Sequence, residues 1–332
     1  MMRNKLSRRN LIAAAASATA LLATRRSASA QNYPDYPIRL IVPFPPGGAY
    51  DTLGRPWADR IKPYLGTVVI ENIGGGGASL GAAAAARSRP DGYTLLLGGT
   101  LPHVNEALLK AKPLYDPVND LDPIMRIAVG YLAIAVHPSV PVNTLAELVA
   151  RIKANPGKFS YGHSGVGGTN HLIGELFKSI AGIPDLIQIP YRGAGPAMGD
   201  LVSGQIPMGI VGVQAQSLGF HRNGTIKILA VTSKKPLVAA PDLPTTGSAG
   251  FPGITNESSY GLLAPAGTPR PIIDKVAQAS RALLSTKEYQ QLMIDMGFEA
   301  TPESDPEDFR RVLAADVALW GPIVKSLGLK LD

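Results

Sequence analysis

Residues 38–55 read Ile-Arg-Leu-Ile-Val-Pro-Phe-Pro-Pro-Gly-Gly-Ala-Tyr-Asp-Thr-Leu-Gly-Arg, and the rest of the chain is expected to be built around them. Its first five residues are rich in β-branched side chains and predict a buried strand, which must end at Pro43 because proline cannot donate a ladder hydrogen bond. Gly47 and Gly48 then allow a tight turn, and Asp51 or Thr52 is expected to cap the helix that follows. The stretch therefore predicts a strand, a glycine turn and a helix start in direct succession.

Such a turn can serve as a seat for an anion. The first backbone N–H groups of a helix have no partner within the helix and lie at its positive end, which suits a carboxylate. The alternative is a plain tight connection between a strand and a helix that binds nothing. The rest of the chain has to decide between the two.

The composition predicts a globular protein with two domains. The chain has 332 residues, of which 45% are hydrophobic and 17% are charged. Its 36 glycines and 29 prolines indicate many short connections between strands and helices. Because there is no cysteine, disulfides and thiolate chemistry are excluded.

Residues 1–30 are predicted to be an export signal. Basic residues precede an apolar run at 11–23, and Ala-Ser-Ala at 28–30 predicts cleavage after Ala30. The run Ser-Arg-Arg-Asn-Leu at 7–11 fits a twin-arginine signal, and the general secretion route stays open. Without this segment, which carries six basic and no acidic residues, the formal net charge of +7 falls to +1. The mature protein is therefore expected in the periplasm, and nucleic-acid binding has little support.

Two further strands are predicted at 68–71 and 93–97, each followed by a glycine-rich turn. Strands that alternate with helices predict a parallel sheet, whose ligand crevice lies outside the carboxyl ends of the strands. The turns at 47–48, 74–77 and 98–100 are therefore expected to face one cleft. A dinucleotide site is not favoured at 74–77, because the G-x-G-x-x-G pattern needs glycine where Ser79 or Leu80 stands.

The chain is expected to cross between two domains. Residues 124–137 form its longest apolar extended stretch, too long for an ordinary strand, and predict the first crossing. Residues 228–232 are the candidate for the return crossing. The C-terminal helices are expected to pack back on the first domain. The predicted domains are 31–132 together with 250–332, and 133–249.

A second glycine loop, Gly-His-Ser-Gly-Val-Gly-Gly-Thr-Asn at 162–170, again lies between a strand and a helix and predicts a second anion seat. Ser164 and Thr169 are expected to donate hydrogen bonds to a ligand oxygen. Tyr191 is a candidate wall of the cleft. Arg192 is a candidate carboxylate partner, with a solvated loop charge as the favoured interpretation.

Catalysis and metal binding find little support in the sequence. The loop begins like an esterase nucleophile elbow, but G-x-S-x-G requires glycine where Val166 stands. A hydrolase that uses Ser164 stays as a less favoured alternative. The five histidines show no metal-ligand spacing, and His163 is assigned equally to binding or to plain loop structure. We expect no catalytic residue, no metal and no cofactor.

In addition to these features, the chain resembles the tripartite tricarboxylate transporter substrate-binding protein family, the TctC-like or Bug periplasmic solute receptors. The resemblance runs through essentially all of the mature chain in family order. Its segments include 36–48 (Tyr-Pro-Ile-Arg-Leu-Ile-Val-Pro-Phe-Pro-Pro-Gly-Gly), 90–96 (Pro-Asp-Gly-Tyr-Thr-Leu-Leu), 137–141 (His-Pro-Ser-Val-Pro) and 261–269 (Gly-Leu-Leu-Ala-Pro-Ala-Gly-Thr-Pro). The departure is at 74–77, where relatives often show a proline and an interrupted glycine run.

The resemblance implies an α/β fold of the two-lobed periplasmic binding protein type II, with two parallel-rich sheets joined by hinge crossings. It implies that loops matching 45–50 and 164–169 grip a ligand carboxylate through amides, hydroxyls and ordered water. The implied ligand is a mono-, di- or tricarboxylate or an aromatic acid, delivered to membrane transporter subunits. A sensor subunit that presents the ligand to a signalling partner is the alternative. The candidate ligand-binding residues are Phe44, Pro46, Gly47, Gly48, Ala49, Tyr50, Asp51, Gly76, Ser79, Thr100, His163, Ser164, Gly165, Gly168, Thr169 and Tyr191.

Overall fold

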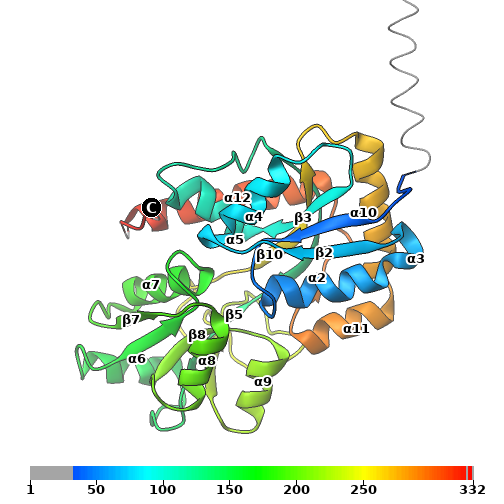
Figure 1. The fold of residues 1–332 in the computed structure, drawn as a ribbon. Helices are drawn as coiled ribbons and strands as arrows, with labels where there is room; N and C mark the ends of the chain where they lie inside the picture. Colours follow the sequence, from blue (N-terminus) through cyan, green and yellow to red (C-terminus); the bar gives the residue numbers. More distant parts are fainter. Residues whose placement is uncertain (1–32, 327, 331–332) are drawn as a thin grey trace, which may run out of the picture.

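The structure, a computed structural model, describes residues 33–326 and 328–330. The predicted export signal at 1–30 lies outside these residues. Two β-sheets with flanking helices lie one above the other in Figure 1, and the β1–α2 connection, in dark blue, descends from the upper one toward the lower. The predicted α/β fold with two lobes is confirmed.

The first sheet has six strands in the order β11-β4-β10-β3-β1-β2. β1 pairs in parallel with both β2 and β3, whereas β10 runs antiparallel to β3 and β4, and β11 runs antiparallel to β4. The sheet is therefore mixed, with its parallel strands in the part that carries the first loop. The strands are β1 (Ile38–Val42), β2 (Val68–Asn72), β3 (Thr94–Gly99), β4 (Leu121–Gly130), β10 (Ser258–Pro265) and β11 (Glu299–Ala300).

The second sheet has five strands in the order β7-β6-β8-β5-β9. β6 pairs in parallel with β7 and β8, and β5 runs antiparallel to β8 and β9. This sheet is mixed in the same way as the first. The strands are β5 (Leu132–Val136), β6 (Ser160–His163), β7 (Ile187–Pro190), β8 (Met208–Gly212) and β9 (Lys227–Val231).

Helices cover both faces of each sheet, as the alternation of side chains along the strands requires. In β1, Leu40 and Val42 join a core with residues of α2 and α10, whereas Ile41 packs on the other face with α4. The helices are α2 (Ala49–Arg60), α3 (Lys62–Leu65), α4 (Ser79–Ala86), α5 (Thr100–Val104), α6 (Leu145–Lys153), α7 (Thr169–Ala181), α8 (Ala194–Val202), α9 (Ala215–Arg222), α10 (Arg270–Leu284), α11 (Lys287–Met296) and α12 (Pro306–Ser326), with short helical turns η1 (Gly76–Ala78) and η2 (Asn105–Leu109). None of the helices in the described part of the chain is long and apolar enough to span a membrane.

Only Tyr131 separates β4 of the first sheet from β5 of the second. The predicted first crossing in 124–137 is therefore confirmed. The predicted return at 228–232 is wrong, because this segment forms β9 and pairs with β5 inside the second sheet. The chain re-enters the first sheet at β10, after Asn256, whose N–H donates to the Thr232 carbonyl at 3.0 Å.

Helix α12 contributes to both hydrophobic cores. Phe309 and Leu313 pack with the α4 face of the first sheet. Trp320 and Val324, in the second half of the helix, belong to the core that contains β5, β6 and α7. The expectation that the C-terminal block packs on the first domain is therefore confirmed for α10, α11 and the first half of α12. Its second half bridges the two lobes.

Candidate functional site

The parallel register of β1, β2 and β3 brings their carboxyl ends, and the turns that follow them, to one edge of the first sheet. The first two turns touch, since a Cβ on Gly74 would lie 2.8 Å from Cδ of Pro45. Pro45, Pro46 and Gly47 are exposed. The structure thus brings the 43–48 loop and the 74–77 turn together, as the strand pattern predicts.

Asp51 organises the 43–48 loop, which we call the first loop. Its side chain is only 6% exposed, and its Oδ2 accepts hydrogen bonds from the Gly47 N–H and from Arg55 Nε, both at 2.9 Å. Its Oδ1 accepts from Arg55 Nη2 at 2.8 Å and from Asn72 Nδ2 at 3.0 Å. Burial raises the pKa of Asp51, but hydrogen bonds from Arg55, Gly47 and Asn72 bring this pKa below its ordinary value. The carboxylate is therefore a structural anion within the loop.

The expected cap by Asp51 or Thr52 is wrong, because the N-cap of α2 is Gly48, which has no side chain to accept the first amides. Within the described residues, the backbone N–H groups of Ala49, Tyr50 and Asp51 have no hydrogen-bond partner. These are the orphan donors of a helix start, with the positive end of the helix dipole behind them. They can donate hydrogen bonds to the oxygens of an anion.

The aromatic residues of the first loop pack inward. Phe44 stacks on Tyr50 with ring centroids 4.6 Å apart, and Tyr50 meets Tyr260 edge to face at 4.8 Å. Tyr50 is 5% exposed, and burial raises the pKa of its hydroxyl well above the ordinary value. These rings fix the shape of the loop, and Phe44, which is partly exposed, is the one that can also touch a ligand.

Ser79 and Thr100 turn their hydroxyls into the first lobe. Ser79 donates to the fully buried Glu106, and Thr100 Oγ1 donates to Asp316 Oδ2 at 2.5 Å while it accepts the Ser259 N–H at 2.9 Å. Burial raises the pKa of Asp316 to about 6. Of the candidates in this region, Gly76 remains exposed at the turn, with a positive φ of 59°.

The acids Glu106 and Asp316 are absent from the residues chosen by sequence. Glu106 lies in η2, and Asp316 lies 216 positions after its partner Thr100. No local pattern links either acid to the glycine turns. Only the packing of η2 and α12 against α5 brings them under this edge of the sheet.

The second loop, residues 164–168, lies between β6 and α7 and rests on two buried histidines. His163 is 0% exposed and His171 is 2% exposed, and their rings stack with centroids 4.6 Å apart. His163 Nδ1 lies 3.0 Å from the Gly165 carbonyl, and His171 Nδ1 accepts the Gly167 N–H at 3.2 Å. Burial, with a smaller contribution from the neighbouring His163, lowers the pKa of His171 to about 4. His163 is thus a support of the loop, beneath its surface.

The start of α7 matches the start of α2. Its N-cap is Gly168, which makes no side-chain cap, and the N–H groups of Thr169, Asn170 and His171 have no partner in the part of the chain that is described. The same holds for the Thr169 hydroxyl, although this residue is only 8% exposed. The Thr169 hydroxyl can therefore donate to a ligand oxygen, as predicted.

Ser164 differs from its predicted role. Its hydroxyl donates to Asn170 Oδ1 at 2.9 Å, so its proton is already used, and the expectation that Ser164 donates to a ligand is wrong for this arrangement. Among the described residues, the side chain that meets the Ser164 hydroxyl is Asn170 and not a base, and His163 Nε2 meets Gln188 Oε1 at 2.5 Å. Ser164 is therefore not placed as a nucleophile. Asn170, which follows Thr169 at the helix start, is a polar residue that the sequence analysis missed.

Tyr191 follows β7 at the same edge of the second sheet as the second loop. Its ring covers Gly162, where a Cβ would lie 3.1 Å from the ring, and its hydroxyl donates to Asp200 at 2.7 Å. Burial raises the pKa of Tyr191 to about 12, with a further contribution from Asp200. Arg192 next to it is exposed, and its guanidinium has no partner in the described residues.

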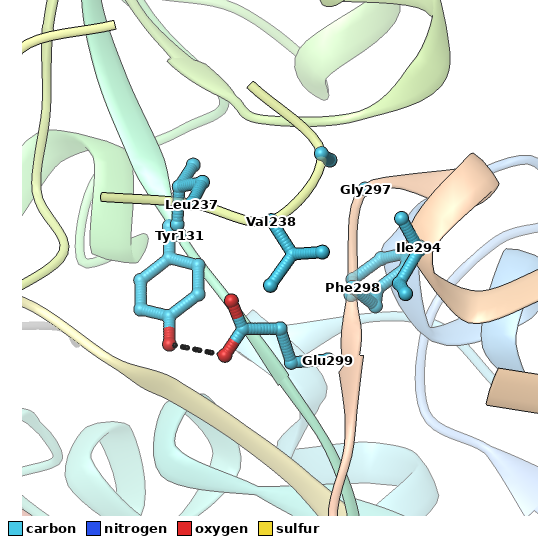
Figure 2. Close-up of a pocket in the computed structure, with 8 residues that line it drawn as sticks. Tyr131, Leu237, Val238, Ile294, Gly297, Phe298 and Glu299 are labelled. Atoms are coloured by element: carbon cyan, nitrogen blue, oxygen red, sulfur yellow. Dashed lines mark hydrogen bonds between the residues drawn. The ribbon is translucent and has the colours of Figure 1, made fainter. Parts of the chain in front are cut away.

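A small pocket lies near the crossing between the lobes (Figure 2). The Tyr131 hydroxyl donates to Glu299 Oε2 at 3.1 Å there. None of the sequence-predicted site residues lines this pocket. Its lining residues are Tyr131, Leu237, Val238, Ala239, Ile294, Gly297, Phe298 and Glu299. In the described chain, no group of three or more histidine, aspartate or glutamate side chains is arranged to hold a metal ion.

Comparison with known proteins identifies the family. The family model TctC, described as the tripartite tricarboxylate transporter family receptor, matches residues 54–329. Protein BugT of Bordetella pertussis is 33% identical over 307 residues, which cover 91% of this chain and 93% of BugT.

Solved structures agree. Rpa4515 of R. palustris, determined with adipate, superposes with a TM-score of 0.83 at 31% identity and covers 90% of this chain and 99% of its own. MatC from Rhodopseudomonas palustris, determined with bound malate, gives a TM-score of 0.79 at 26% identity and covers 88% of this chain and 100% of its own. The family is one of periplasmic binding proteins and not of enzymes. With uncapped helix starts at the strand ends of both lobes, a family model that matches residues 54–329 and a relative that covers 91% of the chain, the protein belongs to the tripartite tricarboxylate transporter family of receptors.

Proposed function

We propose that this receptor captures a small organic carboxylate in the periplasm, between a first lobe of residues 31–132 and 250–332 and a second lobe of residues 133–249. It then delivers the ligand to the membrane subunits of a tripartite tricarboxylate-type transporter. The ligand class comprises mono-, di- and tricarboxylates and aromatic acids. The adipate and malate in two related structures support a dicarboxylate among these.

The observation that carries this proposal is the pair of uncapped helix starts. Helices α6 and α11 are capped by the hydroxyls of Thr144 and Thr286, whereas α2 and α7 begin at Gly48 and Gly168 with no side-chain cap. Helices α8 and α10 also begin without a side-chain cap, at Gly193 and Pro269, so the proposal depends on the place of α2 and α7 directly after the glycine loops. An uncapped start costs stability unless another group satisfies the amides. A ligand carboxylate at each start satisfies them without a cation, because the fork of Arg55 is already bound by Asp51.

Closure of the lobes follows from such a ligand. A dicarboxylate that binds the amides of α2 and α7 together favours the closed arrangement over the open one, because only closure allows both contacts. Tyr131, the single residue between β4 and β5, is the place where the change of angle is expected. No bond is made or broken in this process.

Proline substitutions at the first helical position test the two proposed carboxylate-binding sites. The first seat is the set of free backbone N–H groups at the start of α2, and the second seat is the set at the start of α7. Ala49→Pro removes one N–H from the first seat, and the extended backbone of Gly48, at φ −83° and ψ 175°, accepts a following proline. Thr169→Pro does the same at the second seat, and Thr169→Val measures the loss of the hydroxyl alone. Lys287→Pro, at the start of α11, is the matched control in a helix outside the proposed site.

Isothermal titration calorimetry with succinate, malate, adipate, citrate and benzoate gives the readout. We expect at least one acid to bind one to one and to be recovered unchanged. Ala49→Pro and Thr169→Pro should each weaken the affinity for this acid by about tenfold or more, which corresponds to the loss of one hydrogen bond to a charged group. Lys287→Pro should bind like the unaltered protein. The proposal fails if no acid binds, if product forms, or if both seat variants bind as tightly as the control.

A further inference from the structure

The hydrogen bond between Ser164 and Asn170 has a fixed direction. Asn170 Nδ2 donates to the Ile210 carbonyl at 2.7 Å, and a carbonyl can only accept, so the amide nitrogen must face Ile210. Asn170 Oδ1 then faces Ser164 at 2.9 Å, and this oxygen can also only accept. The proton of Ser164 therefore lies on the bond to Asn170.

Ser164 Oγ can therefore only accept a further hydrogen bond, through its lone pairs. The residue is partly exposed, and a Cβ on Gly168 would lie 3.2 Å from this oxygen, so it lies beside the N-cap of α7. The second seat thus combines donors, which are the amides at the start of α7 and the Thr169 hydroxyl, with one acceptor next to them. A plain carboxylate can satisfy the donors and offers nothing to the acceptor.

We propose that the receptor selects carboxylates that carry a hydroxyl close to the carboxylate held at α7, and that Ser164, oriented by Asn170, is the residue that reads this hydroxyl. The inference rests on the proposed function. In a closed site, a ligand without the hydroxyl leaves the Ser164 oxygen unsatisfied, and sites built in this way discriminate strongly against the analogue that lacks the group.

The charges around the second loop favour a hydroxyl over an ammonium group. A buried ammonium needs a carboxylate partner. The acids of this region are already engaged, since Glu175 accepts the Tyr161 hydroxyl and pairs with Lys178, and Asp200 accepts the Tyr191 hydroxyl. A neutral donor on the ligand requires no such partner.

Matched ligand pairs test this inference. We would measure the affinities of L-malate and D-malate against succinate, of 2-hydroxyglutarate against glutarate, and of 2-hydroxyadipate against adipate, by calorimetry on the full mature chain. For the pair that fits the cleft, the hydroxylated member should bind at least about tenfold tighter. Aspartate serves as the amino analogue of malate and should bind more weakly than malate.

Variants assign the effect to Ser164. Ser164→Ala removes the acceptor and should bring the affinity ratio of the hydroxylated and plain members close to one. Asn170→Ala frees the Ser164 proton and should also lower the ratio. Thr169→Val should weaken both members by a similar factor, because its hydroxyl serves the carboxylate.

Two outcomes overturn the inference. If plain acids bind as tightly as their hydroxylated partners in every pair, or if Ser164→Ala keeps the preference, Ser164 does not read a hydroxyl, and the proposed carboxylate function stands without it. If no acid of any pair binds, the inference falls, and the proposed function fails with it only if citrate and benzoate do not bind either.

Discussion

Replacing Asp51 by asparagine tests the support of the first loop directly. Oδ2 accepts two hydrogen bonds and Oδ1 accepts two more, so whichever way the new amide is turned, its NH₂ group meets two donors. A hydrogen bond to a charged group contributes about 1.5–3 kcal/mol. Because the Arg55 side chain is 52% exposed, its share is small. We therefore expect Asp51→Asn to lower the free energy of unfolding by about 2 kcal/mol, close to one buried charged bond.

Urea unfolding at neutral pH gives the measurement, and Asp59→Asn is its control. Asp59 lies on the same helix and is exposed, so its substitution makes the same change of charge and should alter stability by no more than about 0.5 kcal/mol. The ligand affinity of Asp51→Asn should fall as well, because one of the two carboxylate oxygens that hold the first loop is replaced by a donor. Equal unfolding midpoints for the two variants would refute the support that we assign to Asp51.

The difference between Asp51→Asn and the unaltered protein should also depend on pH. The folded protein lowers the pKa of Asp51 below its ordinary value of 3.8, so the stabilisation is complete above this value. It is lost as the pH falls through the lowered pKa of the folded state. The two proteins should therefore become more alike in strong acid.

Three further predictions concern other parts of the fold. Burial lowers the pKa of His103 to about 4, so the protein should lose about 3 kcal/mol of stability from this residue as the pH falls from 6.5 to 4. His171, whose pKa is also lowered to about 4, adds to the loss, and an unfolding midpoint that is the same at pH 7 and pH 4.5 would contradict this. Gly297→Ala should lower the free energy of unfolding by at least about 1 kcal/mol, because the φ of Gly297 is +86° and a Cβ would lie 2.4 Å from the Val213 carbonyl of the second lobe. Calorimetric melting gives the measurement, and an unchanged melting temperature would contradict this contact. Gly174→Ala should lower the free energy of unfolding in urea by about 1–3 kcal/mol, because a Cβ would lie 2.2 Å from the Tyr161 ring. Gly199→Ala, where a Cβ has nothing within 4 Å, should not destabilise α8, and similar losses of stability in both variants would argue against overpacking.

The sequence predicts the strand ends and the helix starts well, because these depend on local residues. β1 ends at Val42, before the first proline, and α7 begins at Thr169, after the second glycine loop. The direction of the side chains at these places was harder to predict. Asp51 reaches back to Gly47 and across to Asn72 in place of capping its own helix. A local pattern cannot show this, because the partner lies 21 residues away in a neighbouring strand.

The polar residues of the first lobe show the same limit more sharply. Ser79 and Thr100 lie at the predicted turns, yet their hydroxyls face Glu106 and Asp316 inside the lobe. A buried acid attracts the nearest hydroxyl because its desolvation must be offset by hydrogen bonds. The positions of both acids depend on tertiary packing, so the sequence could place these hydroxyls at the edge of the sheet but could not give their direction.

The packing of the first lobe indicates which of the two loops adapts to a ligand. A continuous row of rings leads from the first loop to the lobe crossing, with centroids 4.6, 4.8 and 5.5 Å apart, formed by Phe44, Tyr50, Tyr260 and Phe298. Gly130, the last residue before the crossing, lies against this row, since a Cβ there would be 3.0 Å from Phe298 and 3.1 Å from Tyr260. Because close-packed side chains have low compressibility, a displacement at one end of this row of rings is passed on to the other end. We therefore expect the first loop to move as one body with its end of the hinge, so that, under the proposed function, the closure angle and the second loop, where Ser164 and Asn170 lie, accommodate differences between ligands.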